Sequence, residues 1–88
     1  MSLLDNIQNY YETLVLESLA KQIKGQKYDE DVLTDILCIA INHLPPRYIR
    51  HEVDFLYYMS PIERQEIEEK AEKAVQDALQ YIKDKNRS

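Results

Sequence analysis

The clearest helical pattern in the chain is SPIERQEIEEKAEKAVQDALQYI, residues Ser60–Ile82. It opens with Ser60–Glu63, a capping box in which proline occupies the first helical position. Apolar residues then recur at spacings of three and four, which is typical of a helix with one buried face. Glu66–Lys70 and Glu69–Lys73 have the spacing and order of stabilising i, i+4 ion pairs. The stretch therefore predicts a long helix that begins just after Ser60.

Two further helices are predicted upstream of this one. From about Leu3 to Ile23, apolar residues form a stripe broad enough to pack on two neighbours, either within the chain or across a dimer. Gly25, the only glycine, lies where a left-handed residue often ends a helix. A second apolar stretch starts after the acidic residues 29–31 and ends before Pro45, because the residue preceding a proline is driven out of the helical region. Its apolar residues cover most of its circumference, so we expect it to be the central, buried helix.

The composition is that of one helix-rich domain spanning residues 1–88, with a polar tail at 84–88 that we expect to fray. The single cysteine, Cys38, excludes a disulfide or a cysteine-based zinc cluster within one chain and favours a reducing compartment. A net charge of −5 argues against binding to duplex nucleic acid, whose affinity comes largely from neutralised phosphates. No apolar run is long enough to cross a membrane, and the first residues lack the basic segment of a signal peptide. We expect a cytoplasmic domain.

The connection between the second and third helices is LPPRYIRHEVDFLYYM, residues Leu44–Met59. Connections between packed helices usually have about two to eight residues, and longer ones tend to be functional or to contain an element of their own. We expect an extended chain through Arg47–Arg50, followed by a short helical turn around Val53–Tyr58. The predicted fold class is therefore all-α, with three main helices and an irregular or short helical segment after the LPPRY motif.

This connection carries the one locally basic patch of an acidic chain, which consists of Arg47, Tyr48, Arg50 and His51. Guanidinium groups bind phosphate in bidentate fashion and stack on flat rings, so the patch suits a nucleotide-like anion. The alternative is structural, with both arginines paired to the surplus carboxylates. Asn42, just before the double proline, either caps the end of the second helix or contacts a ligand.

The residues that could support catalysis or bind a metal do not form a recognisable set. His43 and His51 lie eight residues apart across two prolines, with no carboxylate or thiol at a spacing that would complete a metal site. The chain contains no phosphate-binding glycine loop, no dinucleotide glycine pattern and no Ser/His/Asp order. The tyrosine doublets at 10–11 and 57–58 are more typical of a core or a dimer contact than of a cofactor site. We expect neither an enzyme nor a bound metal or cofactor.

The segment IAINHLPPRYI, residues 39–49, resembles the signature ALN-x-LPPRYV of the late competence development protein ComFB family. Residues 9–15, NYYETLV, are similar to the N-terminal N-x-x-E-x-x-V helix of that family, and Asp35-Ile36 resembles the Asp-Val that precedes the signature. The likeness extends over most of residues 5–80. It implies a small, mostly helical bacterial protein of the cytoplasm that pairs as a homodimer and has no catalytic activity.

Some members of that family are understood to be receptors for cyclic dinucleotides, with the ligand associated with the dimer. The residue chemistry and this resemblance converge on one segment, where we expect Arg47 and Arg50 to hold phosphates and Tyr48 or Tyr57 to offer a ring face to a base. The choice between cyclic di-GMP and cyclic di-AMP stays open. Members with a cysteine cluster before the Asp-Val element bind zinc there, but residues 24–34 contain no cysteine, so no zinc site is expected.

The competing interpretation is an interaction module without a small ligand. The broad stripe of the first helix and the aromatic run Phe55–Tyr58 would then dock a partner protein. Phosphate binding through arginine weakens with ionic strength, whereas aromatic docking does so far less, and this difference distinguishes the two. In either case the sequence does not identify the downstream partner.

Overall fold

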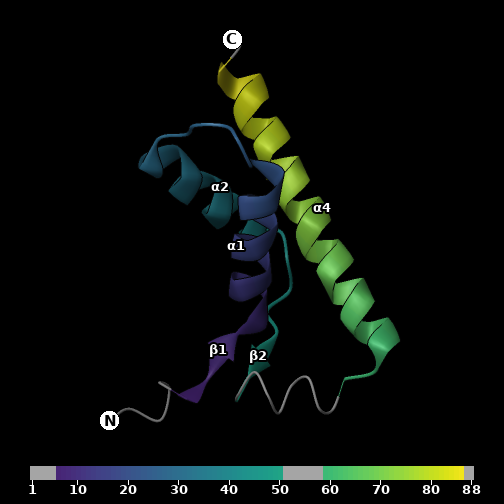
Figure 1. The fold of residues 1–88 in the computed structure, drawn as a ribbon. Coiled ribbons are helices and arrows are strands. Elements are labelled where there is room, and N and C mark those ends of the chain that lie inside the picture. Colours follow the sequence, from purple (N-terminus) through teal and green to yellow (C-terminus); the bar gives the residue numbers. More distant parts are fainter. Residues whose placement is uncertain (1–5, 51–58, 87–88) are drawn as a thin grey trace.

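The computed structural model describes residues 6–50 and 59–86, and these form three helices and one small sheet (Figure 1). In chain order the elements are β1 (Gln8–Asn9), α1 (Tyr10–Gln22), α2 (Glu30–Asn42), β2 (Tyr48–Ile49) and α4 (Pro61–Asn86). β1 and β2 are antiparallel, with Gln8 opposite Ile49 and Asn9 opposite Tyr48. The described part of the chain is thus mostly helical, as predicted, and it adds one small sheet, because the residues before α1 pair with the residues after the double proline.

α4 is the element on which the other two helices pack. It runs beside α1 along the length of the molecule, and α2 lies across the upper part of the view (Figure 1). The buried side chains form a cluster: Tyr10, Tyr11, Leu14, Val15 and Leu19 of α1; Ile36 and Ala40 of α2; Ile49 of β2; and Ile67, Ala71, Ala74, Val75, Ala78 and Leu79 of α4. The small alanine side chains let α1 and α2 approach α4 closely. α4 continues to residue 86, so it includes part of the segment 84–88 for which fraying is predicted.

α2 is not the central helix that its apolar circumference predicted. Only Ile36 and Ala40 of α2 are buried, whereas α1 buries five residues and α4 six. Its other apolar side chains are half-buried, namely Val32, Leu33, Leu37, Ile39 and Ile41. α2 packs against α1 and α4 and lies at one edge of the described helices (Figure 1), so these five side chains are covered only in part.

The helix ends follow the capping chemistry of the sequence. Ser60 precedes α4, and its Oγ accepts a hydrogen bond from the Glu63 backbone N–H at 3.1 Å, which confirms the predicted cap. Gly25 has φ +82°, so it supplies the left-handed residue predicted after α1. α2 begins directly after Asp29 and ends at Asn42, ahead of the double proline as predicted.

α1 begins later than the apolar pattern predicted. Its first residue is Tyr10, whereas the pattern indicated a start near Leu3, and residues 1–5 lie outside the described part of the chain. Asn9 has an extended backbone (φ −82°, ψ 112°), and its side chain accepts a hydrogen bond from the Tyr11 backbone N–H. It is therefore the N-cap of α1 and a strand residue at once. A residue with that backbone conformation cannot lie inside a helix, so the predicted start is wrong.

The connection after α2 is extended where it was predicted to be, since β2 lies within the stretch Arg47–Arg50. The helical turn predicted around Val53–Tyr58 lies outside the described residues. Over the described ranges, none of the helices combines the length and the hydropathy needed to cross a lipid bilayer.

Candidate functional site

A hollow of about 290 Å³ lies where the double-proline loop meets the beginnings of α1 and α4. We call it the Arg47 hollow, and its lining residues are Tyr11, Pro45, Pro46, Arg47, Glu63, Glu66, Ile67 and Lys70. α1 supplies the tyrosine, the loop supplies residues 45–47, and α4 supplies residues 63–70. The hollow is therefore a product of the tertiary fold and not of any one motif.

Asn9 fixes the backbone of Arg47 at this hollow. Its side-chain Oδ1 accepts hydrogen bonds from the backbone N–H of Tyr11, at 3.2 Å, and from the backbone N–H of Arg47, at 2.9 Å. The Arg47 carbonyl accepts a further hydrogen bond from the Tyr10 N–H at 2.7 Å. Both backbone groups of Arg47 are thus bonded to the start of α1. The guanidinium projects from a backbone whose position is set before any ligand arrives.

The hollow carries charges of both signs. Arg47 and Lys70 contribute two cations, and Glu63 and Glu66 contribute two carboxylates. The three α4 residues among them are spaced at i, i+3 and i+7, which places them on one face of the helix. A ligand in the hollow would therefore meet cations and carboxylates together.

The ion pairs on α4 differ from those predicted. Among the described residues they are Arg64–Glu68 and Lys73–Asp77, with N···O distances of 3.3 and 3.2 Å. The predicted pairs Glu66–Lys70 and Glu69–Lys73 are wrong, the second because Lys73 bonds to Asp77 instead. Glu66 and Lys70 both line the hollow. Neither forms an ion pair with the other or with any other described residue.

Tyr11 forms an aromatic wall of the hollow and is 3% exposed. Burial raises the pKa of its phenol above the ordinary value, and the nearby positive charge of Arg47 lowers it in part. A phenol with a raised pKa is neutral over the physiological range. Tyr11 is therefore a neutral, buried side chain beside the hollow and adds no charge to it.

Of the predicted ligand residues that the structure describes, Arg47 alone lines the hollow. Tyr48 is an exposed residue of β2, and Arg50, the residue that follows β2, is also exposed. The Tyr48 side chain is 67% exposed, so its ring face is open to solvent. His51 and Tyr57 lie outside the described residues.

Asn42 lies at the end of α2 and does not line the Arg47 hollow. Its amide donates a hydrogen bond to Cys38 Sγ at 3.5 Å, one turn back along the helix. The helix end is capped by His43 instead, whose Nδ1 lies 2.7 Å from the Ile39 carbonyl oxygen. The capping prediction for Asn42 is therefore wrong, because its side chain reaches the sulfur while the next residue meets the carbonyls. Its contact with a ligand stays a prediction.

Sequence reasoning missed the residues that complete the hollow from other elements. Asn9 is an asparagine just ahead of an apolar helical pattern, and this N-cap signal could have identified the start of α1, but not the hydrogen bond to Arg47, 38 positions away. Glu66 and Lys70 offered no such signal, because their place beside Arg47 depends on how α4 packs against α1. Local spacing suggested an ion pair for them and nothing more.

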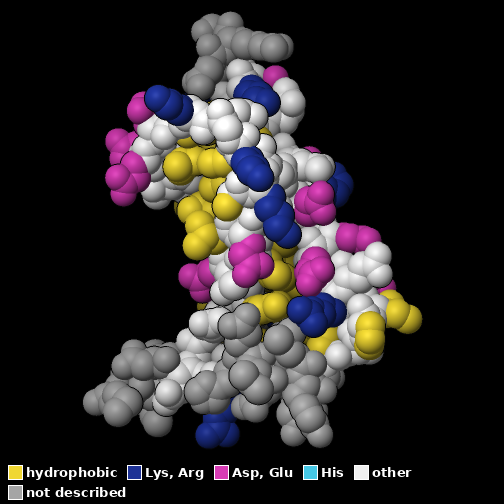
Figure 2. Space-filling model, viewed as in Figure 1, with side chains coloured by type: hydrophobic (Ala, Val, Ile, Leu, Met, Phe, Trp, Pro, Cys, Tyr) yellow, Lys and Arg dark blue, Asp and Glu magenta, His cyan; other side chains and the backbone are white. Residues whose placement is uncertain are grey.

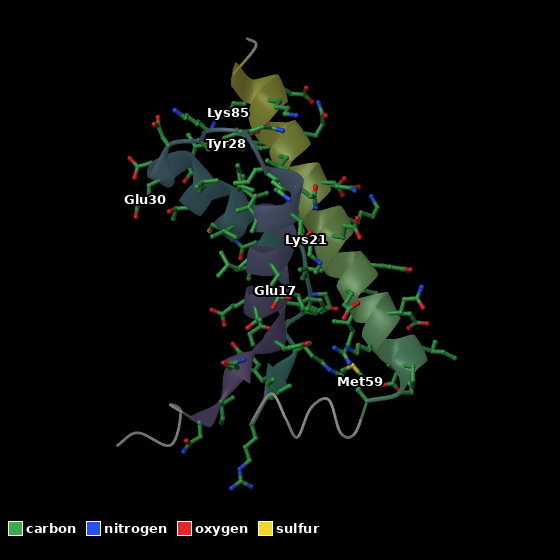
Figure 3. All side chains as sticks on the ribbon, in the orientation of Figure 1. Glu17, Lys21, Tyr28, Glu30, Met59 and Lys85 are labelled. Carbon is green, nitrogen blue, oxygen red and sulfur yellow. The ribbon has the colours of Figure 1, made fainter. Side chains whose placement is uncertain are left out.

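Other hollows lie between other elements. One of about 340 Å³ follows the seam between α1 and α4, beside Glu17 and Lys21 (Figure 3). Figure 2 shows acidic and basic side chains interspersed on this face, with no large area of one sign. A third hollow, of about 550 Å³ and mainly apolar, lies between α2 and the end of α4, beside Ile39, Tyr81 and Ile82. Within the part of the chain that the structure describes, no three metal-ligating side chains gather.

Comparison with protein families matches residues 8–86, nearly the whole chain, to the family described as late competence development protein ComFB. The matched range contains both strands, the three described helices and all the lining residues of the Arg47 hollow. No curated protein and no solved structure matches the chain significantly.

Proposed function

We propose that this chain, which belongs to the late competence development protein ComFB family, is a non-catalytic bacterial signalling protein of the cytoplasm. In this proposal it is a homodimer and binds a cyclic dinucleotide, either cyclic di-GMP or cyclic di-AMP. The observation that supports it is the Arg47 hollow, where a guanidinium on a backbone fixed by two hydrogen bonds lies in the same lining as Lys70.

The chemistry of the loop suits a phosphate that carries a base. Arg47 offers a planar bidentate donor and Lys70 a point charge, both of which bind phosphate oxygens. Tyr48 and Arg50 are both exposed, on either side of the buried Ile49. Outside the hollow, this exposed ring and cation could supply a stacking surface and a second phosphate contact.

The homodimer is supported by the apolar side chains that one copy leaves uncovered. α2 has five half-buried apolar residues, and Leu16 of α1 is 57% exposed. A second copy that covered part of this surface would stabilise the dimer by about 25 cal/mol for each Å² of apolar area removed from water. A two-fold dimer would also present two identical Arg47 hollows to a ligand that is itself two-fold symmetric.

The alternative is a protein interaction module without a small ligand. The observation that favours it is the mainly apolar hollow of about 550 Å³ between α2 and α4, at whose edge Tyr81 is 55% exposed. An apolar hollow with an exposed aromatic residue is typical of a site that accepts side chains of a partner protein.

Thermal unfolding with and without ligand tests the proposal. The protein is heated alone and with saturating cyclic di-GMP, cyclic di-AMP or the linear dinucleotide as control. A ligand at 100 times its dissociation constant adds about 2.7 kcal/mol to the stability of the native state. In a domain of this size each kcal/mol raises Tm by roughly 4–8 °C.

A large rise in Tm with a cyclic dinucleotide, and little with the linear control, would support the receptor. An unchanged Tm with both cyclic ligands would reject it and favour the interaction module. Light scattering of the protein alone tests the homodimer separately, since a mass near the 10.5 kDa of one chain would exclude it.

A further inference from the structure

The carboxylates of the Arg47 hollow are not explained by phosphate binding. Glu63 and Glu66 line the same hollow as Arg47 and Lys70. A phosphate that contacted only the cations would still be repelled by the carboxylates of the same lining. A ligand that fits must present an anion to the cations and hydrogen-bond donors to the carboxylates.

The three charged α4 residues of the hollow surround Ile67, whose side chain is 9% exposed and packs into the core. Glu66 and Lys70 enter no ion pair with another described residue, whereas other α4 charges pair along the helix. Their hydrogen-bonding capacity is therefore available to a ligand. The exposed double proline supplies an apolar wall against which a flat ring can lie.

We infer that Glu63 and Glu66 bind the hydrogen-bonding edge of a guanine base and make the site selective for cyclic di-GMP over cyclic di-AMP. This inference rests on the proposed function. An ionised carboxylate only accepts hydrogen bonds. Guanine has two adjacent donors, N1–H and the N2 amino group, which the two oxygens of one carboxylate accept together. Adenine has one amino donor beside the N1 lone pair, and that lone pair would face a carboxylate oxygen.

The size of the hollow agrees with a single base. Its volume of about 290 Å³ lies just below the range of small-molecule sites, about 300–1,000 Å³. It would therefore hold one base with its phosphate and not the whole ligand. In the proposed homodimer the second guanine would enter the hollow of the other copy, so both bases would meet the same carboxylates.

The experiment measures the affinity of the full chain for three probes by isothermal titration calorimetry. The probes are cyclic di-GMP, cyclic di-AMP and cyclic di-IMP, whose hypoxanthine base keeps N1–H but lacks the N2 amino group. The variants are Glu66→Gln, Glu63→Gln and the double variant. The matched control is Glu69→Gln, which removes one negative charge from the same helix at a residue that does not line the hollow.

We expect the wild-type protein to bind cyclic di-GMP at least about tenfold more tightly than cyclic di-AMP, and cyclic di-IMP to lie between them. The double variant should lose most of this preference, while Glu69→Gln keeps it. Two results would overturn the inference and leave the receptor intact. One is equal or tighter binding of cyclic di-AMP by the wild type, and the other is an unchanged preference in the double variant. Binding of none of the probes would overturn the proposed function itself.

Discussion

The side-chain oxygen of Asn9 lies 2.9 Å from the backbone nitrogen of Arg47 and accepts its hydrogen, across 38 positions of sequence. The same oxygen caps α1 through the Tyr11 N–H. One amide side chain therefore sets the first turn of a helix and the position of the cation on which the proposed site depends. If the proposed function holds, Asn9 couples the stability of the fold to ligand binding.

Asn9→Ala should lower the free energy of unfolding by about 1–2 kcal/mol, because it removes the N-cap acceptor and the acceptor for Arg47 N–H. In a domain this small the loss lowers Tm by roughly 4–16 °C. Asn9→Asp is the matched control, since it keeps an acceptor oxygen at the same place. Equal melting of the alanine variant and the wild type would show that the two bonds carry little stability.

Arg47→Ala should weaken cyclic dinucleotide binding at least about tenfold while Tm stays within a few degrees, and Arg50→Ala should do so less strongly. The fold survives because the bonds that hold residue 47 come from its backbone. Arg64→Ala is the control, as Arg64 pairs with the exposed Glu68 and does not line the hollow. Titration calorimetry gives the affinities, and full retention in both Arg47→Ala and Arg50→Ala would remove the site assignment.

The raised pKa of Tyr11 predicts a loss of stability at alkaline pH. In the unfolded chain the phenol ionises near its usual pKa of 10.0, whereas burial keeps it protonated to higher pH in the folded state. Protons are then bound more tightly by the folded protein, so the free energy of unfolding falls as pH rises from 10.0 to the raised pKa. Tyr11→Phe should lack this part of the fall. Arg47→Ala should extend it to higher pH, because Arg47 lowers the pKa of Tyr11.

Urea unfolding at a series of pH values above neutrality measures the effect. Tyr48→Phe is the control, since its side chain is 67% exposed and contributes little to the core. If Tyr11→Phe and the wild type lose stability in parallel across this range, ionisation of Tyr11 is not responsible.

The core of the single chain can be tested with two isoleucines of very different burial. Ile36 of α2 is 0% exposed and Ile62 of α4 is 71% exposed. Ile36→Val should lower the free energy of unfolding by about 0.5–1.5 kcal/mol, and Ile62→Val by less than about 0.5 kcal/mol. Chemical denaturation of both variants provides the comparison. An equal loss would mean that Ile62 is covered by a contact outside the single chain.

The helices could be predicted from sequence because their signals are local. The serine-proline start of α4, the glycine after α1 and the double proline after α2 each act through the conformation of one or two residues. The sheet could not be predicted in this way, since strands of two residues are too short for a period of two to show. The start of α1 was predicted too early. The apolar residues near Leu3 and Ile7 fit the helical spacing, and the two-residue strand β1 gives no pattern of its own that would interrupt it.

The candidate site was predicted only in part. Arg47 was identified from its residue type and its neighbours, but Glu63, Glu66 and Lys70 reach it through packing between elements far apart in the chain. The burial of α2 was overestimated on similar grounds. Apolar residues around a helix show that its side chains can be buried. Whether they are buried depends on which other elements pack against the helix, and the helix's own sequence does not show this.

The two-residue length of β1 and β2 has a consequence for motion. A pair of strands this short is not stable alone. The hydrogen bonds that join Asn9 and Tyr10 to Arg47 also close a long loop of the chain, and loop closure costs conformational entropy. These bonds should therefore form late in folding and open first, while residues such as Val75 stay buried between the helices. In hydrogen exchange, the amide of Arg47 should exchange through local opening and the amide of Val75 only through global unfolding. Under the proposed function, a ligand could then leave the Arg47 hollow while the core formed by α1, α2 and α4 stays packed.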